Sequence, residues 1–191
     1  MNFYKPEHLP RLMVAPNGAR PSKKDHPAVP VTISETVETA KACFKSGATG
    51  IHFHMRDEKG QHILDSGLCK EALTELQRQV PKMHLQVTTE AVGRYSPEAM
   101  RKLAYDVIPP GISIGIREMI PSRQPTSDDI KVYKKLTESG TKIQHICYGP
   151  EDVDLLSNLL DKAELSKNGT WCMFVIGHYS CLLYTSPSPR D

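Results

Sequence analysis

The chain has 191 residues, 39% of them hydrophobic and 24% charged, which suits a single domain with a packed core. Its 24 Lys and Arg residues against 22 Asp and Glu residues argue against nucleic-acid binding driven by bulk charge, because neutralising phosphates requires a basic surplus. The sequence contains no apolar run of the roughly 18 residues that a membrane span requires, no secretory signal pattern, and no CxxC spacing among its cysteines. We therefore expect a cytoplasmic protein that binds neither nucleic acid nor membranes.

Short apolar runs bounded by glycine, proline or polar turn residues predict six β-strands. The expected strands are 12–15, 49–55, 84–89, 112–116, 142–148 and 171–176. Between them, capping residues and apolar stripes predict five helices. These helices are expected to begin near Ser34, Ser66, Ser96, Thr126 and Gly149, with Ser34 as the N-cap of the first.

Strands and helices that alternate with a repeat of roughly 30 residues predict parallel strands joined by crossover helices. A dinucleotide-binding sheet would carry GxGxxG after its first strand, but the chain has Asn17-Gly18-Ala19 there, and it has no phosphate-binding GxxxxGK[ST] loop. We therefore favour an α/β fold of the (β/α)8 TIM-barrel type, truncated to about six βα units.

The C-terminal residues break this pattern. A helix should follow the last strand, but the chain ends in a Ser/Pro-rich segment without helical periodicity. The string CLLYTSPSPRD resembles a translated library adapter. We expect residues 1–179 to form the truncated barrel domain, residues 180–191 to be a non-native tail, and the natural protein to continue past Tyr179.

His52 and His54 lie two residues apart on the second predicted strand, so their side chains share one face. Two imidazoles on one strand are half of a transition-metal site, usually zinc, and a barrel has its active site at the C-terminal ends of its strands. The alternative is a hydrogen-bonded histidine pair without metal. Possible third ligands are Glu90, Glu118, His145 and His178, or a residue outside this chain.

Polar residues also lie at the ends of the other predicted strands or directly after them. They are Asn17, Thr88, Thr89, Glu90, Arg117, Glu118 and Tyr148. In a barrel these strand ends converge on one mouth, so we expect these residues to bind a polar, anionic small molecule. Arg94 and Arg117 are candidates for a bidentate clamp on a carboxylate.

Several sequence blocks resemble the β-keto acid cleavage enzyme family, to which the 3-keto-5-aminohexanoate cleavage enzymes belong. They are residues 13–19, 26–30, 48–57, 86–90 and 174–177. The blocks occur in order, the resemblance spans residues 11–179, and the block around His52 is the most specific.

The resemblance implies a (β/α)8 barrel whose divalent metal, usually zinc, is held by His52 and His54. It implies exchange of acyl groups between a β-keto acid and acetyl-CoA, giving acetoacetate and a new CoA ester, in a homo-oligomer. It assigns a substrate-binding hydroxyl to Thr88, and further substrate contacts to Arg117, Glu118 and Tyr148. The family's remaining carboxylate ligand follows a late strand and matches no position here, and the general base stays unassigned.

Two departures from the family bear on the substrate. Arg20 stands where many relatives have an acidic residue, and Glu90-Ala91 replaces the glycine pair of relatives that cleave the amino substrate. Both favour a β-keto acid of different charge, and the arginines favour an acidic one. Two other readings stay open. In the first, the chain is a different zinc-dependent barrel, an aldolase or hydrolase. In the second, it has no activity as written, because six units leave two sheet edges unpaired.

Overall fold

The computed structural model of the chain describes residues 3–5 and 7–175. Within them, six strands form one parallel sheet in the order β1-β2-β3-β4-β5-β6, so each strand pairs with its neighbours in sequence. The strands are β1 (Met13–Val14), β2 (Gly50–Phe53), β3 (His84–Thr88), β4 (Gly111–Gly115), β5 (Lys142–Cys147) and β6 (Trp171–Phe174).

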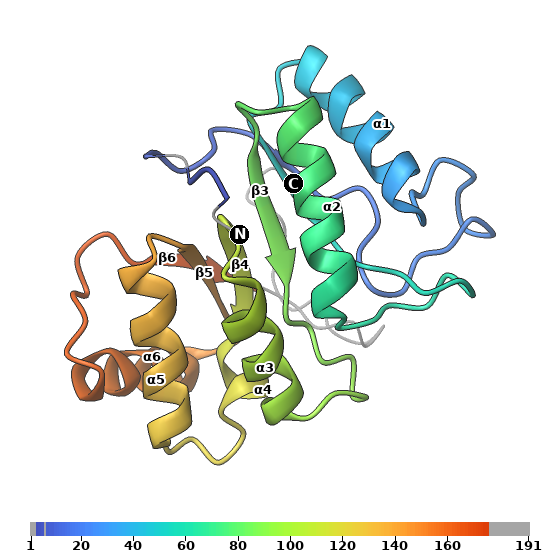
Figure 1. The fold of residues 1–191 in the computed structure, drawn as a ribbon. Coiled ribbons are helices and arrows are strands. Elements are labelled where there is room, and N and C mark those ends of the chain that lie inside the picture. The colour runs from blue at the N-terminus through green and yellow to red at the C-terminus, as the bar shows by residue number, and fades with distance from the viewer. Residues whose placement is uncertain (1–2, 6, 176–191) are drawn as a thin grey trace, which may run out of the picture.

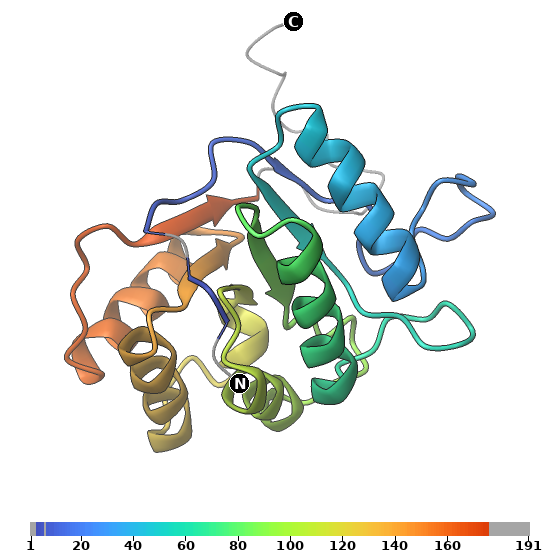
Figure 2. The ribbon, with the colours of Figure 1, turned by 45° about the horizontal axis from the view of Figure 1, so that its top comes forward.

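The helices connect successive strands and pack against one another on the outside of the curled sheet (Figures 1 and 2). They are α1 (Ile33–Lys45), α2 (Ser66–Gln79), α3 (Pro97–Val107), α4 (Ile116–Met119), α5 (Ser127–Glu138) and α6 (Pro150–Lys162). A parallel sheet in sequential order with helices on one side is the arrangement of a (β/α)8 barrel. The predicted fold class is therefore confirmed, and the described residues form an incomplete TIM barrel of six strands.

The caps explain where the helices begin. Thr32 is the N-cap of α1: its hydroxyl accepts from the backbone N–H of Glu35, whose carboxylate accepts from the backbone N–H of Thr32. The prediction that Ser34 caps this helix is wrong, because the reciprocal box between Thr32 and Glu35 places Ser34 in the first turn. Side-chain caps also begin α2, α3 and α5, at Asp65, Ser96 and Thr126.

The ends of the strands differ in detail from the prediction. β2 ends at Phe53, so His54 lies one residue beyond it. β4 ends at Gly115, and Arg117 and Glu118 belong to the four-residue helix α4, where the sequence predicts the end of a strand and a loop. Of the last predicted strand, Ile176 lies outside the described residues.

Alternation of side chains gives the sheet two different faces. Ile51 and Phe53 of β2 are fully buried in the same apolar cluster as Leu73 and Leu76 of α2, so this face packs on the helices. His52 therefore points to the inner face. The inner face is crowded at Gly111, where a Cβ atom would lie 2.4 Å from Nε2 of His84.

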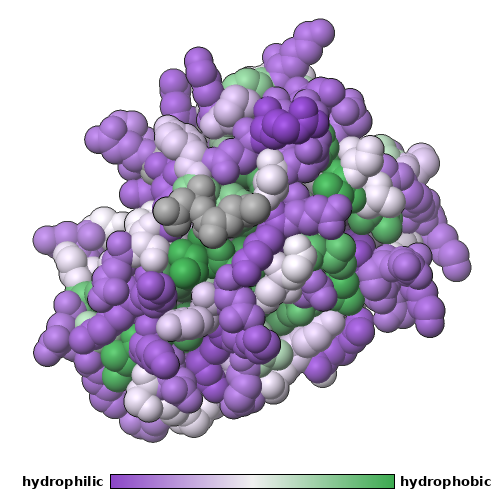
Figure 3. All heavy atoms as spheres, viewed as in Figure 1, coloured by the Kyte–Doolittle hydropathy of each residue, from purple (hydrophilic) through white to green (hydrophobic). Residues whose placement is uncertain are grey.

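The face of the molecule seen in Figure 3 is mostly hydrophilic, with apolar residues exposed between charged ones. Exposed large apolar side chains occur at both outer strands of the described sheet: Leu12 precedes β1, and Met173 and Phe174 belong to β6. A closed barrel would have further strands beside these two edges.

Among the described residues, no helix is long and apolar enough to cross a bilayer.

Candidate active site

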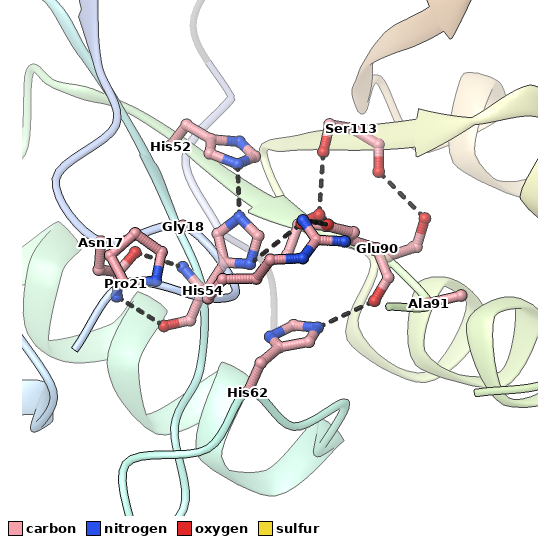
Figure 4. A network of polar contacts seen from close by, with 12 residues as sticks. Asn17, Gly18, Pro21, His52, His54, His62, Glu90, Ala91 and Ser113 are labelled. Carbon is pink, nitrogen blue, oxygen red and sulfur yellow. Dashed lines mark hydrogen bonds and ion pairs between the residues drawn. The ribbon is translucent and has the colours of Figure 1, made fainter. Parts of the chain in front are cut away.

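The two histidines of the predicted metal site meet at the C-terminal end of β2. Nε2 of His52 lies 3.0 Å from Nε2 of His54, and the two ring planes are 74° apart (Figure 4). Nδ1 of His52 lies 2.7 Å from Oε1 of Gln86, which is opposite His52 in the register of β2 and β3. The expectation that the two side chains share one face is confirmed.

Burial keeps both imidazoles neutral. It lowers the pKa of His52, and it lowers the pKa of His54 to about 2, with further lowering from His52, His62 and Arg56. A neutral imidazole has a free nitrogen lone pair, which is the form that binds a metal ion. The pair therefore has the right chemistry for a metal at neutral pH.

The spacing also fits a shared ion. Nitrogen ligands lie about 2.0–2.1 Å from zinc, which in tetrahedral geometry puts two of them about 3.3 Å apart. The 3.0 Å between the two Nε2 atoms is close to that separation. His52 and His54 thus fit half of a zinc site.

The main chain of His54 is held by Asn17, a predicted site residue at the end of β1. Nδ2 of Asn17 donates to the carbonyls of His54 (2.9 Å) and Pro30 (3.2 Å), and Oδ1 accepts from the N–H of His54 (3.1 Å). The amide of Asn17 therefore fixes the position of His54 in the site.

Sequence reasoning missed two residues beside this pair. The buried Arg56 guanidinium donates to the carbonyls of Gly18 (2.6 Å) and Pro21 (2.8 Å), which ties down the loop after β1. His62 lies with its ring centroid 5.0 Å from that of His54, and its Nε2 donates to the Glu90 carbonyl (2.9 Å). Arg56 follows His54 by two residues, which is a usable signal, whereas no spacing singles out His62.

Glu90 and Glu118 bring two carboxylates to the same region. Oε2 of Glu90 lies 3.8 Å from Nδ1 of His54, and its Oε1 pairs with Arg20 at 3.3 Å. Oε2 of Glu118 accepts from the N–H of Ala91 (3.2 Å). Burial raises the pKa of both carboxyls, and the charge of Glu90 raises that of Glu118 further. Carboxyls with raised pKa values are suited to proton exchange.

The two threonines at the end of β3 differ in their contacts. Oγ1 of Thr88 accepts from Oγ of Ser113 (3.2 Å) and from the N–H of Glu90 (3.0 Å). The hydroxyl of Thr89 donates to the carbonyl of Ser113 (3.1 Å), and the residue is fully buried. Both hydroxyls thus link β3 to β4.

Arg117 and Tyr148 form a second group with Asp152. Nε of Arg117 donates to both oxygens of Asp152, at 2.8 and 3.1 Å, and the guanidinium lies 5.0 Å from the centre of the Tyr148 ring. The fully buried Asp152 also accepts from Arg123 (3.4 Å) and from the N–H of Tyr148 (2.8 Å). Arg94 instead donates to the carbonyl of His62 (3.4 Å), so the two arginines of the predicted clamp belong to different networks.

The structure also bears on the predicted third ligand. His145 stacks on Tyr133 of α5, on the helix-packed face of β5, so its prediction as a ligand is wrong. Glu90 faces Nδ1 of His54, whereas the nitrogens that converge are the Nε2 atoms. His178 lies outside the described residues. Within residues 3–5 and 7–175, no three His, Cys, Asp or Glu side chains are grouped so that they could hold a metal.

A parallel βα barrel with a neutral histidine pair at the C-terminal end of its second strand belongs to the class of barrels whose active sites lie at that face. The sequence profile of the β-keto acid cleavage enzyme family matches residues 11–189. The chain therefore belongs to the β-keto acid cleavage enzyme family, as the sequence blocks predict.

Two relatives match part of the chain. A 3-oxoadipate:acetyl-CoA acetyltransferase of Cupriavidus necator is 36% identical over 78 residues, which are 41% of this chain and 28% of the relative. A 3-keto-5-aminohexanoate cleavage enzyme of Fusobacterium nucleatum is 31% identical over 85 residues, which are 44% of this chain and 31% of the relative. The matched segments thus span less than a third of either relative.

Solved structures support the same fold. A binary complex of ObcA with oxaloacetate superposes with a TM-score of 0.58 at 14% identity, over 72% of this chain and 34% of that one. A ternary complex of ObcA with a C4-CoA adduct and oxalate gives 0.55 at 14% identity, over 72% and 35%. At this identity the likeness concerns the fold alone.

Proposed function

We propose that this chain is part of a metal-dependent β-keto acid cleavage enzyme. The reaction exchanges acyl groups: the β-keto acid gives its acyl group to CoA, and the acetyl group of acetyl-CoA becomes part of acetoacetate. The observation that carries the proposal is the convergence of two neutral imidazoles, with 3.0 Å between their Nε2 atoms, at the active-site face of a barrel of this family. The name of the Cupriavidus necator relative supports acetyl-CoA as the co-substrate and an acyltransferase activity.

His52 and His54 would hold the metal, which we take to be zinc because imidazole nitrogens suit it. When bound, zinc supplies a Lewis acid that polarises the keto oxygen of the substrate. Asn17 keeps His54 in place through its main chain. Arg56 immobilises the adjoining loop, so the metal ligands need little rearrangement when the substrate arrives.

The other predicted site residues would bind the substrate around this centre. They are Asn17, Thr88, Thr89, Glu90, Arg117, Glu118 and Tyr148. The hydroxyl of Thr88 lies beside Glu90, and the Arg117 guanidinium is held over Tyr148 by Asp152, which suits it to receive a carboxylate.

The charge of the mouth favours an acidic β-keto acid. The Arg20 side chain is 60% exposed and held by Glu90, which places a positive charge near His54. One relative is named for 3-oxoadipate, a β-keto acid with a second carboxylate. We therefore place dicarboxylic β-keto acids ahead of amino-substituted ones as substrates.

We propose that a third metal ligand, an acidic residue after a later strand, lies outside the described residues. The short coverage of both relatives and the six strands of the sheet support a longer parent protein. We expect that protein to be cytoplasmic and homo-oligomeric. Reading the parent gene beyond codon 179 tests this directly. Two further βα units with an acidic residue at a strand end would support it, and a natural stop after the Ser/Pro-rich segment would contradict it.

The decisive experiment replaces His52 by Ala in the full-length protein. Bound zinc is measured by mass spectrometry, and turnover is measured as acetyl-CoA-dependent formation of acetoacetate. We expect His52→Ala to lose both, while the control His8→Ala, which alters an exposed histidine, keeps both. Retained zinc and turnover in His52→Ala would overturn the proposed function.

A further inference from the structure

We propose that Gln86 and Glu90 are positioning residues for His52 and His54. In the metal-bound protein they would keep the hydrogen of each imidazole on Nδ1, so that both Nε2 lone pairs face one ion. The inference rests on the proposed function, because it concerns the histidine pair that would hold the metal. It adds the groups that orient the pair and a proton shift that accompanies metal binding.

The argument for His52 starts from Gln86. The side-chain oxygen of glutamine only accepts hydrogen bonds, and Oε1 of Gln86 lies 2.7 Å from Nδ1 of His52. With the Gln86 amide oriented in this way, Nδ1 of His52 carries the hydrogen. A neutral imidazole has one such hydrogen, so Nε2 of His52 has a lone pair. Gln86 is fully buried in β3, and the strand register keeps it opposite His52.

The ring of His54 can donate a hydrogen bond to the lone pair on Nε2 of His52. In the metal-free protein, the 3.0 Å contact between the two Nε2 atoms is a hydrogen bond only if Nε2 of His54 donates. Its Nδ1 then has a lone pair. This explains why the buried Nδ1 has no hydrogen-bond partner although Oε2 of Glu90 is 3.8 Å away, since two acceptors do not bond to each other.

A metal ion held by both His52 and His54 would need the Nε2 lone pair of each ring. The hydrogen of His54 must then leave Nε2, and the ring stays neutral if Nδ1 gains one by exchange with solvent. Oε2 of Glu90 faces Nδ1 and becomes its acceptor, as a carboxylate behind a metal-bound histidine does. The number of protons on the pair does not change.

Both the side chain and the main chain of Glu90 make contacts that fix its position. Its Oε1 pairs with Arg20 at 3.3 Å, its N–H donates to Oγ1 of Thr88 at 3.0 Å, and its carbonyl accepts from Nε2 of His62 at 2.9 Å. These contacts come from the loops after β1 and β2 and from the end of β3, and Figure 4 shows Glu90 between His62 and the strand that carries Ser113. The contacts with Thr88 and His62 fix the main chain of Glu90, and the ion pair with Arg20 holds the carboxylate beside His54.

The first measurement is long-range proton–nitrogen NMR on the full-length protein labelled with ¹⁵N-histidine, which distinguishes the two neutral forms of each ring. Without metal, we expect hydrogen on Nδ1 of His52 and on Nε2 of His54. With one equivalent of Zn²⁺, we expect His54 to change to the Nδ1 form. Hydrogen on Nε2 of His52 in the metal-free protein, or an unchanged His54 ring in the zinc-bound protein, would overturn the inference.

The second measurement is zinc affinity, by competition with a chromophoric chelator. We expect Gln86→Leu and Glu90→Ala to weaken binding roughly 10- to 100-fold, the range for groups behind metal ligands, and Gln86→Glu and Glu90→Gln to restore most of it because each keeps an acceptor. The matched controls are Gln79→Leu and Glu58→Ala, away from the pair. Wild-type zinc affinity in Gln86→Leu and Glu90→Ala would overturn the inference, and zinc binding with turnover in the wild-type protein would leave the proposed function standing. Absence of zinc from the wild-type protein would overturn both.

Discussion

Two polar networks lie at the C-terminal ends of the strands, and they differ in how completely their buried atoms are paired. The histidine network consists of His52, His54, Gln86 and Glu90, and the buried Nδ1 of His54 in it has no hydrogen-bond partner. The aspartate network consists of Arg117, Arg123, Tyr148 and Asp152, and both oxygens of its buried carboxylate accept hydrogen bonds.

This difference separates buried atoms that are prepared for a ligand from a buried carboxylate, Asp152, that stabilises the fold and holds Arg117 in place. An unpaired buried polar atom costs about 1–3 kcal/mol, so it persists where a ligand or a metal can change its pairing. A fully paired carboxylate carries no such cost. We therefore expect changes in the histidine network to affect metal and turnover, and changes at Asp152 to affect stability.

The largest effect is expected from His54→Ala. It removes one of two converging ligands, so zinc affinity should fall by more than about 100-fold, beyond the range for groups behind the ligands. Acetyl-CoA-dependent turnover should fall with it. The urea midpoint of the metal-free variant should stay close to those of the other variants of the histidine network. Zinc binding at wild-type strength would show that the histidine network is not the metal site.

Acid is expected to destabilise the fold through buried neutral histidines outside the pair. Burial lowers the pKa of both His84 and His145 to about 4. Their pKa values in the unfolded chain are higher, so the unfolded state binds more protons as the pH falls from about 6.5 towards 4, and stability is lost in that window. At pH 5 each should cost about 2 kcal/mol of unfolding free energy relative to pH 7.5. Urea unfolding at both pH values measures this, and His145→Phe should reduce the loss by about 2 kcal/mol.

Asp152→Asn is expected to lower the unfolding free energy by about 2–3 kcal/mol, because it removes the buried charge that pairs with Arg117 and Arg123. The control Asp161→Asn breaks an exposed pair with Lys167 and should change stability by less than about 0.5 kcal/mol. Zinc affinity should stay the same in both variants. A loss of zinc in Asp152→Asn would show that the two networks are coupled.

Arg117→Ala is expected to lower kcat/KM roughly 10-fold, in line with the loss of one charge-assisted hydrogen bond to a substrate carboxylate. Steady-state kinetics with an acidic β-keto acid measures it, and Arg78→Ala, on the exposed side of α2, is the control. If KM and kcat are both unchanged, Arg117 does not contact the substrate.

The smallest effect is expected from Arg20→Gln. This side chain is largely exposed, so its charge is screened by solvent and its loss should reduce kcat/KM for a dicarboxylic β-keto acid only about two- to five-fold. A neutral β-keto acid should show no such loss. Equal losses for both substrates would mean that Arg20 acts by holding Glu90 and does not read the charge of the substrate.

The sequence predicts the fold and the convergence of His52 and His54 better than the rest of the site. The six strands are all found, with shifts of one to a few residues at their ends, because local periodicity and turn residues determine where a buried strand begins and stops. His52 and His54 are predicted correctly to share a face, since that follows from strand geometry alone. The N-cap at Ser34 is predicted wrongly, because Thr32 and Glu35 satisfy each other as a pair.

What the sequence by itself determined is therefore whatever depends on neighbours along the chain: the alternating elements, the parallel order, and the pairing of two imidazoles two residues apart. Only the tertiary structure decided contacts between distant residues. Asp152 lies 35 residues from Arg117, and His62 lies 28 residues from Glu90. Whether His145 faces the helices or the barrel interior likewise depended on the packing of α5. The physical reason is that burial and hydrogen-bond pairing are set by where the strands place each side chain, and no local pattern encodes that distance.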